Sequence, residues 1–403
     1  MDICIGIDIG TQNSCIALPW KSTIDFVENH RGSKQTPTCV GFEDGLRIYG
    51  DDALDQKEVN IKETIDNFTA FIGRDVDEQM REFCDSCSYD LDLSERGKVK
   101  IKVKHSGQDY LFKPEQLLAM HLSNLCKIAS EYSSRDVNRV VLSVPVFYSA
   151  EQRGALLDAC EIANIQCEAL VNETTAVAVW YYLFSSQIPT SNELTRRVVF
   201  VNVGHMHTQV AVFAFTHSTI ELVCTESDSN LGGWHFDQII YNQLKTEYCE
   251  KYMVNQVDPK SYTAVHLRSQ CAEVKSRLCW SPNDVSVHVD GLPDGHVLST
   301  VVRQATFEES SKDLLERFRE LFQRCLNSSG LGREQLDAVE MVGSGFRLPS
   351  IKRVTEEVFG LKCGVSIHEK ESVAGGCAIY VSSAFLIKNG EEFLYLFTPV
   401  GNC

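Results

Sequence analysis

The stretch CIGIDIGTQNSCIAL, residues 4–18, decides the fold. Its apolar residues predict a buried strand up to Ile9, a polar turn that begins at Gly10, and a returning strand from Ser14. Nearly two hundred residues later, VVFVNVGHMHTQVAVFAF at residues 198–215 repeats this pattern. Two β-hairpins with glycine-bearing tips indicate an internal duplication.

Strands and helices alternate around the two hairpins. Pro114 suits the first turn of a helix, and apolar residues recur after it at helical spacing. A capping-box pattern at Ser149 follows a short apolar strand at 140–144. Another predicted strand, 338–342, runs into Gly343. This alternation predicts an α/β fold.

The length of the chain predicts more than one lobe. It has 403 residues, whereas single hydrophobic cores rarely grow beyond ~250 residues. No Pro- or Ser-rich linker divides it, so we expect the lobes to arise from insertions into two duplicated α/β cores. Polar stretches near 75–110 and 250–305 are the expected insertions.

Charge and cysteine content bound the function classes. A formal net charge of −17 argues against nucleic-acid binding, because too few Lys and Arg residues are present to neutralise phosphates. No run of ~18 apolar residues suggests a membrane span. Sixteen cysteines, including the CxxC pair Cys84 and Cys87, are scattered through a chain that opens directly into a strand. We interpret them as reduced thiols of a cytoplasmic protein.

Three glycine turns point to a nucleotide cleft. The two hairpin tips and the Gly343 turn place backbone N–H groups where glycine lets the main chain approach an anion. The chain lacks a GxxxxGK[ST] loop and a GxGxxG fingerprint, so the prediction depends on the combination. His205 and His207 also suggest a metal site, but no further ligand is apparent nearby, and we expect none.

Longer motifs resemble a known family. The first stretch, IGIDIGTQNSC, is similar to the first phosphate loop of heat-shock 70-kDa proteins. NETTAVA at 172–178 and VFVNVGH at 199–205 resemble the 110-kDa branch of that superfamily. LGGWHFD at 231–237, VEMVG at 339–343 and RLP at 347–349 continue the resemblance in order, so that it covers roughly residues 1–390.

The resemblance implies an actin-like ATPase fold, with duplicated ribonuclease-H-like cores forming two lobes and four subdomains around a nucleotide cleft. We expect lobe I at 1–190, with an insertion subdomain at about 38–114. Lobe II is expected at 191–388, with an insertion at about 231–307. A C-terminal tail would follow at 389–403.

The family also implies which residues hold the cofactor, ATP or ADP. Both hairpins would bind the phosphates, the Gly343 turn and Lys275 would bind the adenosine, and Arg347 would lie against the adenine. The implied contacts are Gly10, Thr11, Gln12, Asn13, Gly204, His205, Gly232, Gly233, Lys275, Gly343, Ser344 and Arg347.

Several catalytic positions depart from the family pattern. Asp8 and Glu173 are retained. Thr69 stands where hydrolytic members have a lysine that orients the attacking water, and Asn202 replaces an aspartate that helps to hold Mg²⁺. His207 replaces a threonine near the γ-phosphate. Phosphoryl transfer depends on positioning and electrostatics, so we expect weakened Mg²⁺ binding and severely slowed hydrolysis.

The adenosine and partner-linked positions are altered or ambiguous. A nearby aspartate of the hydrolytic members aligns with Gln209, and Ala272 and Ser276 replace a glutamate and an arginine of the adenosine site. Pro145 and Arg153 match residues that link nucleotide state to the partner domain in the 70-kDa branch. They are equally consistent with a strand-ending proline and a surface arginine.

The resemblance predicts a binding module that opens the cleft of a heat-shock 70-kDa partner and releases its ADP. Because the chain ends soon after the nucleotide fold would end, we expect it not to hold polypeptide clients itself. The alternative is a slow ATPase that cycles as a chaperone. A sugar kinase of the same fold is a third class, but no sequence signal for a sugar pocket is present.

Overall fold

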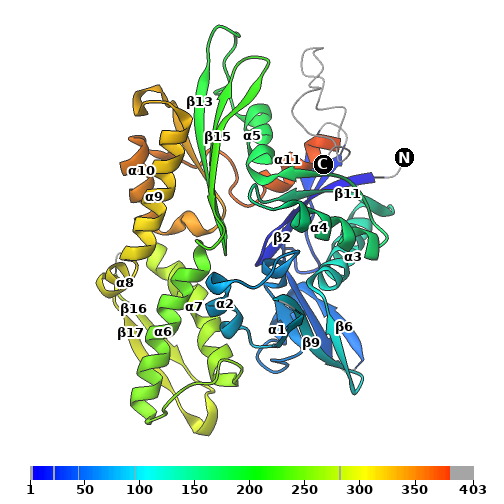
Figure 1. Ribbon diagram of the computed structural model, residues 1–403, viewed down its shortest axis with the longest axis vertical. Helices are drawn as coiled ribbons and strands as arrows, with labels where there is room; N and C mark the ends of the chain where they lie inside the picture. Colours follow the sequence, from blue (N-terminus) through cyan, green and yellow to red (C-terminus); the bar gives the residue numbers. More distant parts are fainter. Residues whose placement is uncertain (1–2, 21–22, 44, 96, 281–282, 382–403) are drawn as a thin grey trace.

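The computed structural model describes residues 3–20, 23–43, 45–95, 97–280 and 283–381. The tail predicted at 389–403 lies outside them. Two lobes lie side by side, with the N-terminal half of the chain in one and most of the remainder in the other (Figure 1).

The first hairpin lies at the centre of the first sheet. Strand β1 (Ile3–Ile9) pairs antiparallel with β2 (Asn13–Trp20) and parallel with β11 (Val137–Val144). The strand order is β12-β11-β1-β2-β3, and β4 also pairs with β2. The outer strands are β3 (Thr23–Phe26), β4 (Gln35–Pro37) and β12 (Gln166–Asn172).

The second sheet repeats this arrangement. Strand β13 (Arg196–Val203) pairs antiparallel with β14 (Thr208–Phe215) and parallel with β18 (Ala338–Val342). Its order is β15-β14-β13-β18-β19, where β15 is Ile220–Asp228 and β19 is Cys363–Gly364. Each sheet therefore joins an antiparallel three-stranded meander to two parallel strands, as the predicted duplication requires.

Two helices fill the space between the sheets. Helix α5 (Glu173–Phe184) packs against α11 (Ser372–Val381), and residues of both join a buried core with strands of each sheet. In sequence α11 belongs to the second half, but it packs against β1 and β2 of the first sheet. A Cβ atom on Gly6 would lie 2.2 Å from the backbone nitrogen of Ala378, so this close packing requires glycine.

The remaining helices of the cores follow the sequence signals. Pro114 begins α3 and Ser149 caps α4 through the Gln152 N–H, as the sequence predicts. Gly330 and Gly360 end α9 and α10 in the left-handed conformation. The bounds are α3 Pro114–Ser133, α4 Ala150–Ile162, α8 Gln304–Ser310, α9 Lys312–Ser329 and α10 Pro349–Phe359.

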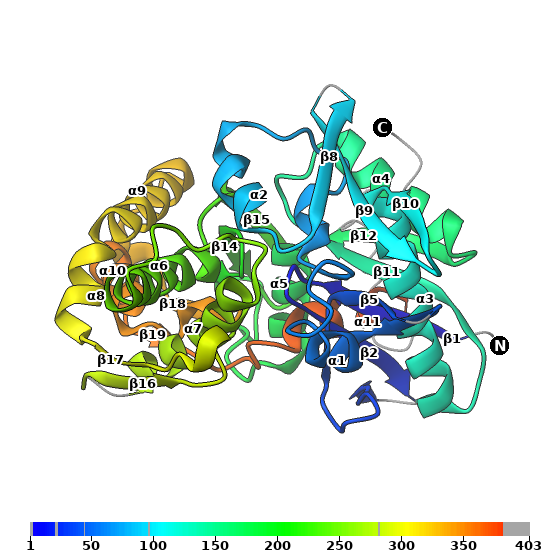
Figure 2. The ribbon, with the colours of Figure 1, turned by 90° about the horizontal axis from the view of Figure 1, so that it is seen from below.

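Each lobe carries an insertion, and the two insertions face each other across the molecule (Figure 2). The first contains two small sheets and two short helices: β5 Cys39–Glu43, β6 Leu46–Tyr49, α1 Gly50–Asp55, β7 Thr64–Asp66, α2 Arg81–Ser86, β8 Asp90–Glu95, β9 Lys98–His105 and β10 Gln108–Phe112. The second contains α6 Gly233–Tyr252, α7 Tyr262–Trp280, β16 Val285–Val289 and β17 Leu298–Val302.

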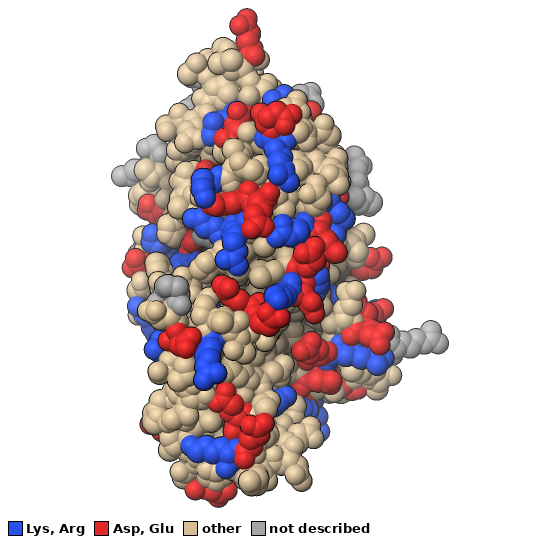
Figure 3. Space-filling model, turned by 90° about the vertical axis from the view of Figure 1, so that its left-hand side faces the viewer, with Lys and Arg blue, Asp and Glu red and all other residues tan. Residues whose placement is uncertain are grey.

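The outer face of the second lobe has mixed charge. On the face shown in Figure 3, basic and acidic side chains are interspersed. Arg319 of α9, for example, forms ion pairs with Glu316 on its own helix and with Glu357 on α10. Among the described helices, none is both long and apolar enough to cross a bilayer.

Candidate functional site

Both hairpin tips and the Gly343 turn meet in one small pocket of about 90 Å³, which we call the hairpin pocket. It brings together most of the residues that the sequence predicted for the site. They are Asp8, Gly10, Thr11, Gln12, Asn13, Glu173, Asn202, Gly204, His205, His207, Gly343 and Ser344. These positions are far apart in the sequence, and the pairing of each hairpin with its parallel neighbour gathers them.

Two glycines make the turns around this pocket tight. A Cβ atom on Gly10 would lie 2.3 Å from the carbonyl oxygen of Asn13, and one on Gly343 would lie 2.3 Å from that of Val203. Gly343 also has a φ of +80°, a conformation that L side chains rarely adopt. Neither turn has room for a side chain in its present geometry.

Gly232 and Gly233 lie behind the second hairpin tip and are not among the lining residues of the hairpin pocket. The N–H of Gly233 donates to the carbonyl of Gly204 over 2.9 Å, and that of Trp234 donates to the carbonyl of His205 over 2.7 Å. Free donors at a helix N-terminus attract anions, but these two are used within the protein. The start of α6 therefore holds the hairpin tip in place.

Glu173, in the first turn of α5, is buried, and its Oε2 atom accepts two amide hydrogen bonds. Asn202 donates over 2.8 Å and Gln209 over 2.7 Å. These two residues are direct partners across β13 and β14, which places both amides beside the same carboxylate. Gln209 also accepts the Val146 N–H over 2.7 Å, so its amide orientation is fixed. We call this set the amide clamp.

Asp8 lies at the end of β1, partly buried, and lines the hairpin pocket. Ser143 donates its hydroxyl to Asp8 Oδ1 over 2.7 Å. Burial, and secondly the nearby charge of Glu173, raise the pKa of Asp8 from 3.8 to about 7. The pocket therefore holds two carboxylates with different surroundings: Glu173 receives two N–H donors, whereas Asp8 is disfavoured as an anion.

The two histidines of the second tip have different surroundings. The Nε2 atom of His207 lies 3.7 Å from Glu173 Oε2, and its ring meets that of Phe147 edge-on at 5.1 Å. Burial, followed by the charge of Lys275, holds the pKa of His205 well below its usual value. No group of three or more His, Cys, Asp or Glu side chains suited to a metal ion occurs among the described residues.

Thr69 lies away from these groups, in the 3₁₀ turn Phe68–Phe71. It is buried, and its hydroxyl has no hydrogen-bond partner. Its carbonyl accepts the hydroxyl of Tyr148 over 3.4 Å. A threonine at this position presents no charge to the hairpin pocket.

Both cations predicted on the adenosine side are already paired. Lys275 donates to the Gly233 carbonyl over 3.0 Å and to Asp237 over 2.6 Å. Arg347 forms an ion pair with Glu369. Cys279, which the sequence analysis did not single out, lies near both cations, and burial raises the pKa of its thiol to about 11. The pairs Lys275–Asp237 and Arg347–Glu369 join residues far apart in the chain, so no local sequence pattern predicts them.

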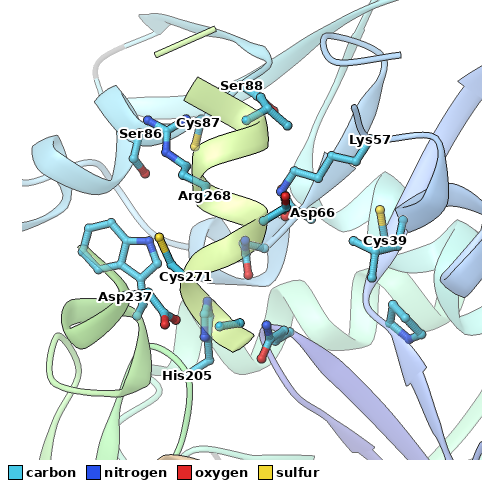
Figure 4. A pocket seen from close by; sticks show the side chains of 18 of the residues that line it. Cys39, Lys57, Asp66, Ser86, Cys87, Ser88, His205, Asp237, Arg268 and Cys271 are labelled. Carbon is cyan, nitrogen blue, oxygen red and sulfur yellow. The ribbon is translucent and has the colours of Figure 1, made fainter. Parts of the chain in front are cut away.

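A larger cavity of about 600 Å³ opens beside the hairpin pocket, between the two insertions (Figure 4). Gln12, Asn13 and His205 line both spaces, so the two are contiguous. Around the larger cavity, Asp237 Oδ1 and Arg268 Nε are buried without a hydrogen-bond partner. Its size is within the usual range for small-molecule sites.

Contacts between the insertions lie beside this cavity, which Glu58 and Ser269 line. Glu58, which follows α1, accepts hydrogen bonds from His266 over 2.9 Å and from Ser269 over 2.7 Å, both on α7. We call this contact the cleft bridge. Lys260 also pairs with Asp90 of the first insertion. Opening the cleft would require these cross-lobe contacts to break.

The hairpin pocket fits the phosphates of ATP or ADP, because its glycine turns leave the main chain open to an anion. Among the lining carboxylates, Glu173 is held by the amide clamp and Glu369 by Arg347, so Asp8 is the residue best placed to hold a hydrated Mg²⁺. Glu173 is a poor ligand while two N–H donors occupy one of its oxygens, since a cation and an N–H group compete for the same lone pairs.

Comparisons with known proteins give one consistent answer. The family model described as Hsp70 protein matches residues 4–390. Heat shock 70 kDa protein 4 of Homo sapiens is 31% identical over 388 residues, which cover 95% of this chain and 46% of that protein. The 97 kDa heat shock protein of Mesocentrotus franciscanus is 31% identical over 378 residues, 93% of this chain and 42% of that protein.

Heat shock protein 88 of Dictyostelium discoideum is similar as well, 32% identical over 384 residues that cover 94% of this chain and 49% of that protein. The chain thus spans about half the length of the curated relatives that it matches. The two-lobed architecture, the duplicated sheets and these matches confirm the predicted actin-like ATPase fold. The chain belongs to the Hsp70 family and resembles its 110-kDa branch.

Proposed function

We propose that this chain is an ATP-binding co-chaperone that accelerates ADP release from a heat-shock 70-kDa partner in the cytoplasm and hydrolyses ATP weakly or not at all. Domains of the Hsp70 family bind ATP or ADP with Mg²⁺. The glycine turns of the hairpin pocket are consistent with retained nucleotide binding. The chemistry around those turns favours a binding role over a catalytic one.

The amide clamp is the observation that carries the proposal. In phosphoryl transfer, the protein must position water and neutralise developing charge. Here Asn202 and Gln209 both donate to Glu173 Oε2, so one oxygen of the retained carboxylate is taken by fixed hydrogen bonds. A carboxylate held in this way is poorly disposed to orient water or to share a metal.

The other substitutions act in the same direction. Thr69 brings no positive charge to the pocket, and Asn202 has no negative charge with which to attract Mg²⁺. Loss of a single preorganised electrostatic group commonly costs about 10²–10³-fold in rate. These two altered positions therefore support very slow hydrolysis and weakened Mg²⁺ binding, with nucleotide binding retained through the backbone.

The partner follows from the family resemblance and from the cleft. A protein that binds ATP without rapid turnover can use the bound nucleotide to hold one conformation of its two lobes. The cleft bridge and the Lys260–Asp90 pair are the contacts whose making or breaking would accompany lobe movement. A face displayed by the closed lobes would then engage the partner chaperone.

The release rate of labelled ADP from a cytosolic heat-shock 70-kDa protein tests the proposal, measured with and without this chain and with ATP present or absent. We expect faster release when the chain is ATP-loaded. The Gly343→Ala variant, which disturbs the pocket, should lose the effect, whereas Gly154→Ala should keep it, because a Cβ atom there meets nothing within 4 Å. Unchanged release in every condition would refute the exchange role.

The alternative is a slow ATPase that acts as a chaperone itself, and a single-turnover assay of ATP hydrolysis distinguishes it from the exchange role. Single-turnover hydrolysis would exceed the rate in buffer and would disappear in the Asp8→Asn variant. That result, together with unchanged ADP release from the partner, would favour the alternative.

A further inference from the structure

Two thiols far apart in the sequence face each other in the second lobe. Cys224 is on β15, the edge strand of the second sheet, and Cys325 is on α9, which packs against it. Their Sγ atoms are 3.6 Å apart, although 101 residues separate them along the chain. Each thiol also has a carbonyl acceptor: Cys325 for Cys224, at 3.3 Å, and Val210 for Cys325, at 3.9 Å.

A β-bulge explains why Cys224 faces the helix. In the pairing of β14 with β15, Val212 lies opposite Cys224 and Phe213 lies opposite Leu222, so Val223 is an extra residue on β15. Successive side chains of a regular strand point to opposite faces, but a bulge interrupts this alternation. Val223 and Cys224 accordingly both pack against the core that contains α9, whereas Leu222 is 47% exposed.

The two sulfurs differ in access and acidity. Cys224 is partly exposed at the edge of the sheet, whereas Cys325 is fully buried. Hydrogen bonding from Cys325 lowers the pKa of Cys224, while the same contact and burial raise the pKa of Cys325. An accessible thiol of lowered pKa beside a buried thiol matches the usual arrangement of an attacking and a resolving cysteine.

We propose that Cys224 and Cys325 form a reversible disulfide when the protein meets a small hydroperoxide. The Cys224 thiolate attacks one oxygen of hydrogen peroxide, forming a sulfenic acid and releasing hydroxide. The Cys325 sulfur then displaces that hydroxyl group, which leaves as water. In sum, two thiols and one hydrogen peroxide give one disulfide and two waters, and a dithiol reductant reverses the change.

The disulfide would close a loop that contains the whole insertion of lobe II, from α6 to β17, together with α8. Cross-linking residues this far apart removes much conformational freedom from the unfolded chain, and the benefit increases with loop length. Oxidation should therefore raise the thermal unfolding midpoint, and it should fix α9 to the sheet edge. The sulfurs need to approach by only ~1.5 Å to reach bonding distance.

Other thiol pairs provide internal comparisons. Cys160 and Cys167 also share a hydrogen bond, but they lie only seven positions apart, so their cross-link would close a short loop. Cys84 and Cys87 form the CxxC pair, and burial raises the pKa of both. A cross-link at either of these places would leave the insertion of lobe II outside the closed loop.

The test treats the folded full chain with hydrogen peroxide, blocks remaining thiols with an alkylating reagent, and maps peptides by mass spectrometry without reduction. We expect one cross-linked peptide that joins Cys224 to Cys325 with a loss of ~2 Da, and its disappearance after a dithiol reductant. The unfolding midpoint should rise in wild type and in a Cys160→Ser control. It should not rise in Cys224→Ser or Cys325→Ser.

Two outcomes would overturn the proposal. One is overoxidation of Cys224 to sulfinic acid while Cys325 stays fully alkylatable after unfolding. The other is a dominant cross-link elsewhere, for example between Cys84 and Cys87, with the Cys224–Cys325 peptide absent. If Cys325→Ser lowers stability before oxidation, the Cys224→Ser variant still decides the question, because its serine replaces a partly exposed thiol.

Discussion

The two hairpins share a backbone arrangement but differ in chemistry. In both lobes an antiparallel hairpin pairs with a parallel neighbour, and both tips reach the hairpin pocket. The first hairpin brings Asp8, an acid whose pKa burial raises, whereas the second brings Asn202 and Gln209, which donate to Glu173. Backbone packing therefore maintains the shape of the cleft independently of the groups that perform hydrolysis.

The difference also has an energetic side. Asp8 and Glu173 are neighbouring carboxylates that both line the hairpin pocket, and their repulsion disfavours the empty pocket at neutral pH. The amide clamp offsets part of this cost by giving Glu173 two N–H donors, since hydrogen bonds to a charged group contribute about 1.5–3 kcal/mol each. The second hairpin therefore stabilises the site that the first hairpin strains.

The largest expected effect is on the first hairpin. Replacing Asp8 by Asn should stabilise the nucleotide-free protein at neutral pH by about 2–4 kcal/mol, because one pKa unit corresponds to ~1.4 kcal/mol. The folded-state pKa is raised from 3.8 to about 7, so the wild type loses stability as pH rises through that interval. The advantage of the variant should grow from pH 4 to 7 and then level off, as measured by denaturant unfolding.

A control keeps this pH profile interpretable. Burial lowers the pKa of both His121 and His235 to about 4, so these residues destabilise wild type and variant alike as pH falls below 6.5. Their effect cancels in the difference between the two proteins. The Asp136→Asn change, at an exposed position, serves as the matched control. A flat difference profile for Asp8→Asn would contradict the proposed strain.

The second prediction concerns the Gly343 turn, which lines the hairpin pocket together with the two hairpin tips. Gly343→Ala should lower stability by about 1–3 kcal/mol, because a side chain must adopt a positive φ and meet the Val203 carbonyl. Binding of a fluorescent ADP analogue should be lost with it. The Gly154→Ala control should retain both properties, and intact binding by Gly343→Ala would contradict the placement of the phosphates.

A change in the second hairpin should make it resemble an acidic metal site. Asn202→Asp replaces an N–H donor to Glu173 by a carboxylate, which should destabilise the metal-free protein by about 1–3 kcal/mol. Added Mg²⁺ should restore the melting temperature of the variant and leave nucleotide-free wild type nearly unchanged. Equal responses of the two proteins to Mg²⁺ would show that the amide clamp does not control metal binding.

The smallest effect concerns the cleft bridge. The Glu58→Gln change weakens the hydrogen bond between residue 58 and His266, but the glutamine retains an oxygen that can accept the hydrogen bond from Ser269. Partly exposed charge pairs contribute about 0.2–1 kcal/mol, so release of bound nucleotide should accelerate by no more than ~5-fold. The difference should shrink at high salt. A matched Glu78→Gln change, at an exposed position outside the bridge, should leave release unchanged.

Much of the fold could be predicted because its signals are local. The apolar strands around Gly10 and Gly204, the proline that begins α3 and the glycine that ends α10 each specify structure within a few residues. The repetition of the hairpin pattern then predicted the internal duplication of the fold. Family motifs gave the identity of the site residues, most of which the structure gathers in one pocket.

The interactions within the site could not be predicted in this way. The amide clamp joins Glu173 to residues 29 and 36 positions away, and its geometry depends on the register of β13 with β14. The pairing of Lys275 with Asp237 and the cleft bridge likewise connect separate elements. The bulge at Val223 turns Cys224 toward α9. The regular alternation of side chains along a strand would not predict this orientation.

Rapid-quench analysis of a stoichiometric mixture of the chain with radiolabelled ATP and Mg²⁺ would show whether the cleft binds ATP while the amide clamp slows its hydrolysis. We expect the protein-bound nucleotide to be recovered as intact ATP, with ADP forming very slowly or no faster than in buffer. Rapid formation of bound ADP, lost in the Asp8→Asn variant, would show instead that the amide clamp does not slow hydrolysis.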